Sequence, residues 1–239
     1  ENKLKRDNDG RIFLDVDPAC FQTIVDYLNE LVISSEDNPP HPPSVDDEHK
    51  HILKHQLGLF GLSDQMPVMP VELPDSTIIK DETKATLLHG WLKEDGSDGD
   101  LSLLYRSSRD GSEDRTFHSK CDNKGCTLTI IETTCGLIFG GYSNTPWQRQ
   151  GDRVCANKAF LFSLGGDSPC KMKLKSANDG CAVYHRSSYG PTFGGGFDLR
   201  VQRQYVCLHF GRSYESCTSL ELQSGTDYPI KEMEVFQMV

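Results

Sequence analysis

Hydrophobic residues recur along this chain with two different periods, and the change from one to the other divides it into two parts. In the first part they return every three or four positions, which places them on one face of a helix. The clearest set is Phe21, Ile24, Val25, Leu28 and Leu31. From residue 101 onward, short apolar runs are separated by Gly, Asp and Asn, as in strands joined by turns. The pattern predicts a helical first part and a second part rich in strands.

The first part is expected to contain one short strand and two helices. Residues 10–15, GRIFLD, alternate as a strand does. Asp17 can cap a helix whose first residue is Pro18, because proline lacks the N–H that would be unpaired there. A cluster of prolines ends that helix. Ser44 is the predicted cap of a second helix, with acidic residues 46–48 in its first turn, near the positive end of the helix dipole.

The second part is expected to fold as an antiparallel sandwich. Residues 63–75 hold three prolines and predict a linker, and Asp75 or Ser76 can cap a helix that runs to residue 92. The many short strands that follow indicate an α+β fold, mainly an antiparallel β-sandwich with flanking helices. The predicted strands are LSLLY, TLTII, GLIFGGY, AFLFSL, KMKLK, CAVYH, FDLRVQ, YVCLHF and KEMEVFQMV.

The stretch from residue 103 to 147 carries a family resemblance. It contains, in order, LLYR, RDG, FHSKCDNKG, TLTII and FGGY, and a later segment reads GPTFGGGFD. These motifs resemble the TLDc domain of oxidation-resistance proteins and nuclear-receptor-coactivator relatives, over residues 76–239. The resemblance implies a β-sandwich, protection against oxidative damage, and association with subunits of the vacuolar proton pump, the V-ATPase.

A second resemblance lies in residues 1–62. The segment DGRIFLDVDPACFQTIVDYLNEL, followed by a proline loop and a helix, is similar to the second half of the BTB-type domain of the potassium-channel tetramerisation family. The opening strands of that family do not occur in this sequence, so we interpret the segment as a partial BTB domain. The resemblance implies homo-oligomerisation or recruitment of a cullin ubiquitin ligase. Alone, residues 1–62 could bury only a thin core.

Composition narrows the classes of partner. The 239 residues are 36% hydrophobic and carry a formal net charge of −10, which disfavours nucleic acid or an anionic membrane surface as the main partner. No apolar run approaches the roughly 18 residues of a membrane span, so no membrane insertion is expected. Residues 1–74 hold 6 Lys and Arg against 14 Asp and Glu, and the remainder 19 against 21. Two units with different partners would explain this asymmetry.

Cysteine usage bears on the compartment. The nine cysteines form an odd set without a regular framework, and the sequence has no N-x-Ser/Thr sequon. We therefore expect mostly reduced thiols in a cytoplasmic protein. Cys121 follows Lys120, whose charge could favour a thiolate. Cys20 and Cys207 lie in apolar runs and are expected to be buried.

One group of residues has a weak metal-site pattern. His118, Cys121 and Cys126 are spaced as His-x2-Cys-x4-Cys. Structural zinc usually takes four ligands, and here the fourth would have to be Cys135 or Cys155, brought in by the fold. We favour a packed histidine with reduced cysteines beside it.

The same stretch holds the residue types of a serine hydrolase. Ser107, Ser108, His118 and Asp122 lie close together in the sequence, with Asp110 between them. A hydrolase also needs an exposed nucleophile on a sharp turn and an oxyanion hole, and the sequence has no G-x-S-x-G. The alternative hypothesis is an enzyme of unfamiliar type, a hydrolase or an oxidoreductase, that uses this polar cluster. It predicts a hydrogen bond between His118 and a serine or cysteine.

Glycine clusters could indicate a phosphate-binding loop. They lie at residues 140–141, 165–166 and 194–196. A Walker loop places a lysine and a hydroxyl directly after its last glycine, and here Phe197 and Asp198 follow instead. We therefore expect bulges or close backbone packing and no cofactor.

Glu232 and Glu234 are two positions apart, which on a strand places both on one face. They could bind a cation or a basic partner, but a solvated strand face is the favoured interpretation. The sequence as a whole favours a non-enzymatic protein-interaction module, without catalytic, cofactor-binding or metal-binding residues.

Overall fold

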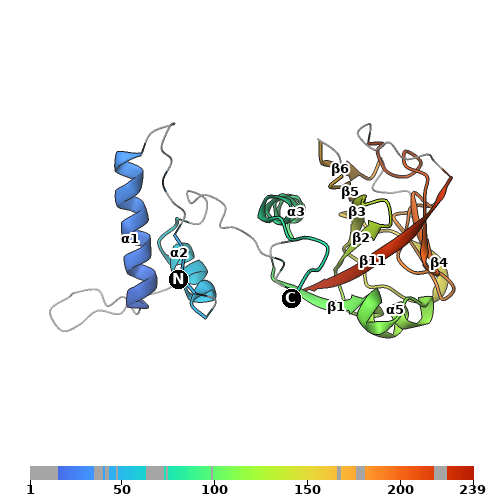
Figure 1. Ribbon diagram of the computed structural model, residues 1–239, viewed down its shortest axis with the longest axis horizontal. Coiled ribbons are helices and arrows are strands. Elements are labelled where there is room, and N and C mark those ends of the chain that lie inside the picture. Colours follow the sequence, from blue (N-terminus) through green and yellow to red (C-terminus); the bar gives the residue numbers. More distant parts are fainter. Residues whose placement is uncertain are drawn as a thin grey trace. The chain divides into compact units, whose positions relative to one another are not determined.

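The computed structural model describes residues 16–34, 40, 43–46, 48–62, 73, 75–97, 99–165, 168–175, 181–217 and 225–239. The chain forms two compact units, residues 1–70 and 71–239 (Figure 1). The predicted strand at 10–15 and most of the predicted linker lie outside the described residues. The predicted domain boundaries at 62 and 75 stay predictions.

Two helices make up most of the described part of the first unit. α1 is Pro18–Ile33, and the side chain of Asp17 accepts the Cys20 N–H at 2.9 Å. The predicted proline start and aspartate cap of this helix are therefore confirmed. α2 is Lys50–Leu59. The two helices share a small apolar core of Cys20, Ile24, Leu53 and Leu57.

α2 begins later than the sequence predicted. His49 stands at its N-terminal boundary without a capping side chain. The Asp46 carboxylate accepts the His49 N–H at 3.1 Å, and residues 48 and 49 are turn residues before the helix. The predicted cap at Ser44 is wrong because aspartate bonds readily to nearby backbone and so competes with helix formation.

The predicted start of the next helix is also wrong. α3 is Glu82–Glu94, and Asp81 caps it by accepting the Thr83 N–H at 2.8 Å. Ser76 instead accepts the backbone N–H groups of residues 78 and 79, at 3.2 and 2.9 Å. These bonds hold the chain in a turn ahead of the helix.

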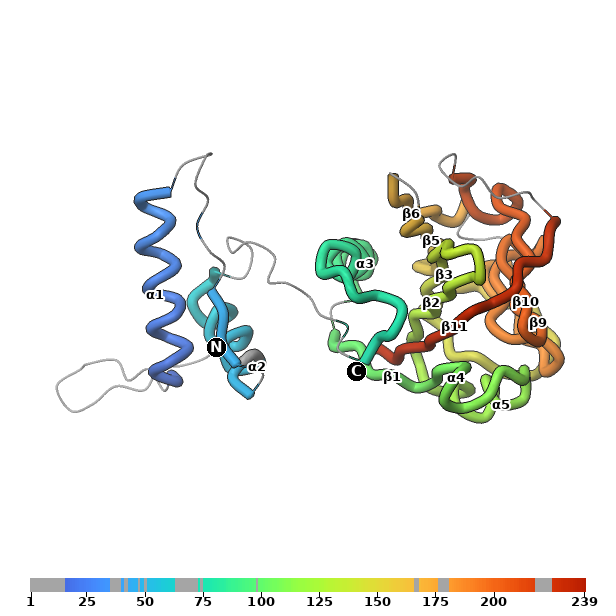
Figure 2. The backbone as a smooth tube through the Cα atoms, viewed as in Figure 1, coloured from blue at the N-terminus to red at the C-terminus, as the bar shows by residue number. Residues whose placement is uncertain are grey.

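The described residues that follow α3 form eleven strands and two short helices, and Figure 2 shows the path of the chain through them. The helices are α4, Ser107–Asp110, and α5, Asp114–Cys121. The strands are β1 Leu101–Arg106, β2 Thr127–Thr133, β3 Ile138–Ser143, β4 Gln150–Val154, β5 Phe160–Ser163, β6 Cys170–Lys173, β7 Val183–Arg186, β8 Thr192–Phe193, β9 Leu199–Gln202, β10 Tyr205–Leu208 and β11 Asp227–Met238. β4 and β8 have no counterpart among the predicted strands.

β11 is the strand on which the sheet is organised. It pairs with β2 along one edge; along the other it pairs with β10 near its start and with β1 near its end. The sheet order is β4-β7-β8-β9-β10-β11-β2-β3-β5-β6, with β1 beside β11. In Figure 1 this strand, in red, crosses the second unit. The predicted α+β fold with a mainly antiparallel sheet is confirmed.

Two apolar clusters lie on opposite faces of β2, β3 and β5. Successive side chains of a strand point to opposite faces, so Ile131 belongs to one cluster and Ile130 to the other. The first cluster also contains Val201 and other residues of β7 to β10, and the two halves of the sheet therefore enclose it. α3 covers the second cluster through Leu88 and Leu92.

Glycines 140 and 141 let neighbouring strands approach closely. A Cβ atom at Gly140 would lie 1.9 Å from the carbonyl oxygen of Thr129, and one at Gly141 would lie 2.7 Å from the Phe193 ring. A side chain fits at neither position, and the prediction of close backbone packing is confirmed here. No helix among the described residues is long and apolar enough to cross a bilayer.

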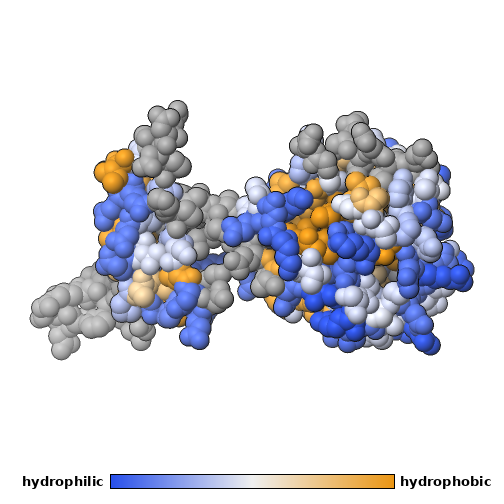
Figure 3. Space-filling model, in the orientation of Figure 1, coloured by the Kyte–Doolittle hydropathy of each residue, from blue (hydrophilic) through white to orange (hydrophobic). Residues whose placement is uncertain are grey.

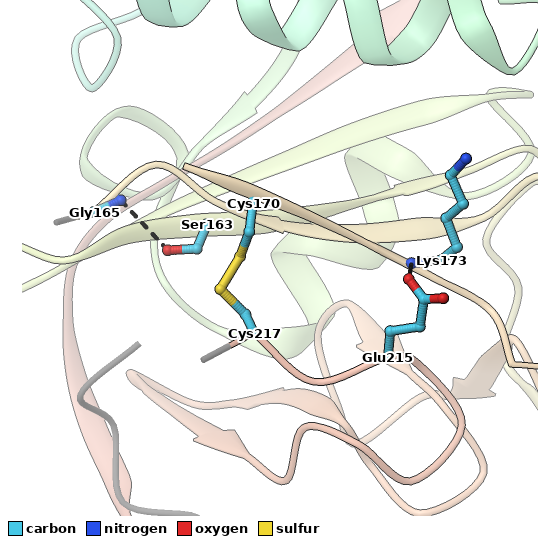
Figure 4. The surroundings of a disulfide bond; sticks show 6 residues. All are labelled: Ser163, Gly165, Cys170, Lys173, Glu215 and Cys217. Atoms are coloured by element: carbon cyan, nitrogen blue, oxygen red, sulfur yellow. Dashed lines mark hydrogen bonds between the residues drawn. A yellow bond between two sulfur atoms is a disulfide. The ribbon is translucent and has the colours of Figure 1, made fainter. Parts of the chain in front are cut away.

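A disulfide joins Cys170 on β6 to Cys217 (Figure 4). The same two segments are also joined by backbone bonds, since the Glu215 N–H donates to the Lys173 carbonyl at 2.9 Å. The Glu215 carboxylate in turn accepts the Lys173 N–H at 3.1 Å. The other seven cysteines are free. Most thiols are therefore reduced, as expected, but this pair was not predicted.

Candidate functional site

The predicted polar cluster lies on α4 and α5, which follow β1. Arg109 and Asp110, part of the RDG motif, form the end of α4. Gly111 follows with a φ of 101°, where a residue with a side chain is strained, and so ends the helix. Two side chains secure the turn, because Asp110 accepts the Arg106 N–H at 3.0 Å and Tyr105 donates its hydroxyl to the Gly111 carbonyl at 2.8 Å.

Ser107 and Ser108 bind Glu232 on β11. The Ser107 hydroxyl donates to the Glu232 carboxylate, and the Ser108 N–H donates to the same oxygen at 3.1 Å. Ser107 also accepts the Met233 N–H at 3.0 Å. Burial alone would raise the pKa of Glu232, but these hydrogen bonds outweigh it and the pKa is lowered. A carboxylate held this way fastens α4 to β11.

Glu234 lies at the centre of a second buried network. Its side chain is fully buried and accepts the Ser76 hydroxyl at 2.6 Å and the Arg106 Nε–H at 2.9 Å. Thr77 donates both its N–H, at 2.7 Å, and its hydroxyl, at 2.9 Å. The predicted solvated face for Glu232 and Glu234 is therefore wrong, because donors from distant segments cover both carboxylates.

His118 does not meet the serines. It is 2% exposed, and its Nδ1 lies 2.7 Å from the Asp122 carboxylate. Its Nε2 lies 3.0 Å from the carbonyl oxygens of both Arg186 and Tyr189. Asp122 also forms an ion pair with Arg149 at 2.6 Å. The histidine therefore ties α5 to the β7 region, and the predicted hydrogen bond to a serine or cysteine nucleophile does not form.

Asp110 is the most strongly perturbed carboxylate of this region. Hydrogen bonding from Arg109, at 2.7 Å, is the main cause and lowers the pKa of Asp110 to about 2. Lys120 adds an ion pair at 3.3 Å. The side chain is 8% exposed. These contacts stabilise the link between α4 and α5.

The cysteines of the candidate metal site are not arranged around an ion. Cys121 is fully buried, and burial raises the pKa of its thiol far above the usual range, so the charge of Lys120 does not produce a thiolate there. Within the ranges that the structure describes, no group of three or more His, Cys, Asp or Glu side chains could hold a metal ion. Cys20 and Cys207 are buried, as predicted.

The GPTFGGGFD segment forms a structural turn. Asp198 is fully buried, and its carboxylate accepts the backbone N–H groups of residues 212, 213 and 214 at 2.9 to 3.2 Å. Gly194 has a φ of 84°, and a Cβ atom there would lie 2.1 Å from the Asp198 carboxylate. The glycines therefore make room for this carboxylate, which confirms the prediction of close packing.

Comparison with known proteins decides the family. Residues 73–239 match the family described as the TLDc domain. That span is more than half of the chain.

This chain belongs to the TLDc family.

Three curated relatives carry the printed name MTOR-associated protein MEAK7. The one from Gallus gallus is 30% identical over 125 residues, which are 51% of this chain and 24% of that protein. The one from Mus musculus is 26% identical over 150 residues, 56% of this chain and 31% of the relative. The one from Danio rerio is 31% identical over 77 residues, 30% of this chain and 16% of the relative. Each match spans less than a third of the relative's length.

Among the surface pockets of the described part of this TLDc domain are two that both include Arg203. One, with a volume of about 190 Å3, is lined by Tyr105, Ser107, Ser108, Ser112, Arg203, Gln204, Ile230, Lys231 and Met233. The other, of about 270 Å3, is lined by Arg200, Gln202, Arg203, Tyr205, Cys207 and Asp227. Neither arginine was predicted as a site residue. The local signal is the run FDLRVQRQY, in which two arginines lie between the aromatic residues Phe197 and Tyr205.

Proposed function

We propose that this TLDc chain acts as a non-enzymatic protein-interaction module. The proposal is supported by the structural contacts of the polar cluster from Arg106 to Asp122. Ser107 is bonded to Glu232, and His118 to two backbone carbonyls. The side chains that a hydrolase would use for chemistry instead join helices to strands.

The finer proposal is association with V-ATPase subunits and a role in protection against oxidative damage. Membership of the TLDc family supports it, because the resemblance of the central motifs implied both roles. The first unit would add self-association or recruitment of a cullin ligase. Exposed apolar side chains on α1 support self-association, since Val32 is 85% exposed and Ile33 81%. Figure 3 shows hydrophobic surface, in orange, at one end of this helix.

The name of the relatives favours a second candidate partner for this chain. Those proteins are named as mTOR-associated, and their similarity to this chain makes association with an mTOR-containing assembly the alternative. The match covers less than a third of each relative.

Affinity capture from cell lysate tests these proposals. The intact chain is the bait, and the captured proteins are scored for V-ATPase subunits, cullins and mTOR. We expect V-ATPase subunits. Recovery of mTOR without pump subunits would favour the alternative, and recovery of neither would refute both partner assignments.

A separate measurement tests self-association. Light scattering would compare the intact chain with a variant that carries Val32→Asp and Ile33→Asp, and with a Gln22→Ala control on the same helix. Dissociation of the double variant alone is expected. A monomeric unmodified chain would refute self-association.

A further inference from the structure

The larger of these two pockets is lined by two arginines whose guanidinium groups have no hydrogen-bond or ion-pair partner among the described residues. Arg200 on β9 and Arg203 in the β9–β10 turn both line it. Among the described residues, neither guanidinium takes part in an ion pair or a hydrogen bond, and the Nε of Arg200 is buried without a hydrogen-bond partner. A buried donor without an acceptor costs free energy. This chain also has a net charge of −10, so two unpaired cations in one pocket stand out.

Aromatic rings hold Arg200 in place. Its guanidinium carbon lies 5.4 Å from the ring centres of both Tyr189 and Phe197. Contacts of this kind restrict the orientation of a guanidinium but do not accept its hydrogen bonds in the plane. The arginine is therefore fixed while its planar set of donors stays available.

Arg203 is also held by the backbone. Its φ is 57°, a conformation that fixes the tight turn, and its N–H donates to the Asp114 carboxylate of α5 at 3.0 Å. The turn is thereby anchored to α5 while the side chain extends into the pocket. Two arginines three positions apart in one hairpin, both lining one pocket, suit an oxyanion that accepts from both.

Two further pocket residues define the class of ligand. Tyr205 is 50% exposed and presents an aromatic ring at the rim. Asp227 also lines the pocket. The pocket therefore holds two positive charges and one negative charge, which suits a ligand with a single anionic group beside an apolar one. At physiological salt the screening length is about 8 Å, so these nearby charges outweigh the distant acidic residues.

We infer that this pocket binds an acidic peptide segment of a partner protein, whose carboxylate or phosphorylated side chain is held by Arg200 and Arg203 and whose neighbouring apolar residue packs on Tyr205. Arginine and tyrosine are the residue types most often found at the energetic centre of protein interfaces. The inference rests on the proposed function only in that the ligand belongs to a protein.

Binding of short peptides to the purified intact chain tests the inference. The probes are a labelled Gly-Ser-Glu-Leu-Gly-Ser peptide, the same peptide with phosphoserine or glutamine in place of glutamate, and inorganic phosphate. We expect the glutamate or phosphoserine peptide to bind and the glutamine peptide to bind at least about tenfold more weakly. No binding of either anionic peptide at millimolar concentration would overturn the inference. So would phosphate that binds as tightly as the peptides.

Variants that remove either a positive or a negative charge from the pocket test the site further. Arg200→Gln and Arg203→Asn are each expected to weaken binding at least about tenfold, whereas Asp227→Asn should strengthen it because it removes the opposing charge. Arg115→Gln is the matched control, since the Arg115 side chain is 83% exposed and lies outside the pocket. Equal effects of all four variants would overturn the site. Because no lysate protein is needed, failure here is distinguishable from failure of the capture experiment.

Discussion

The disulfide between Cys170 and Cys217 allows a quantitative prediction about stability. The two residues are 47 positions apart. In the chain-entropy description, closing a loop of that length in the unfolded chain stabilises the fold by about 4 kcal/mol. For a domain of this size, 1 kcal/mol shifts the midpoint of thermal unfolding by about 2–4 °C. Reduction should therefore lower the midpoint by up to about 8–16 °C.

Tryptophan fluorescence can isolate the relevant transition. Trp91 and Trp147 are the two tryptophans of the chain, and both lie in the unit formed by residues 71–239. Their emission during heating would be recorded with and without reductant, for the unmodified chain and for Cys170→Ser with Cys217→Ser. The unmodified chain should lose stability on reduction. The double variant should start at the lower midpoint and not respond.

Free cysteines provide the matched control. Cys135 and Cys155 are exposed and unpaired, so replacing both by serine should leave the response to reductant intact. Mass spectrometry under non-reducing conditions would show the crosslink directly. An unchanged midpoint after complete reduction would refute the reasoning. The fold itself should persist after reduction, because the backbone bonds between Lys173 and Glu215 remain.

Three further predictions concern buried ionisable groups. Glu234→Gln should lower the free energy of unfolding in urea by about 3 kcal/mol, because its amide N–H groups would face other hydrogen-bond donors. The control is Glu132→Gln, whose side chain forms a surface ion pair with Lys231 and which should lower it by less than about 1 kcal/mol; equal losses would contradict this account. Burial lowers the pKa of His185, so the unfolded chain takes up the proton first and stability falls as the pH drops below about 6.5. His185→Phe should reduce that loss, measured as urea midpoints between pH 7 and 5.5, and identical slopes would argue against it. Because the pKa of Asp110 is about 2 in the fold, this residue contributes about 2 kcal/mol to the free energy of unfolding above pH 4, and the contribution is lost as the pH falls toward 2. In Asp110→Asn the free energy of unfolding should therefore change less between pH 5 and 3, and an undiminished change would count against the role of Arg109.

The fold was largely predictable where the signal is local. The helical spacing and the Asp17 cap predicted α1, and apolar runs predicted nine of the eleven strands. β4 was missed because its sequence, QGDRV, is mostly polar and exposed at the edge of the sheet. β8 was missed because it has only two residues, too few to show a period. β4 is defined by pairing with β7, about thirty residues further along the chain, which the local pattern does not contain, whereas β8 pairs with its chain neighbours β7 and β9.

The candidate site was less predictable because its partners are distant in sequence. Glu234 meets Arg106 across 128 positions and Ser76 across 158. Alternation along β11 correctly placed Glu232 and Glu234 together, but it could not show that donors from α4 and the segment before α3 cover them. His118 was recognised as a packed histidine, whereas its carbonyl partners 68 and 71 positions away depend on the fold.

The position of β11 has a consequence for synthesis on the ribosome. β1 and β2 both need this strand as a neighbour, yet it is made more than a hundred residues after β1. Until residues 227–238 emerge, both earlier strands present an unpaired edge, which is prone to association with other chains. We therefore expect the nascent TLDc domain to need chaperone protection, and to become resistant to protease only once β11 has left the exit tunnel.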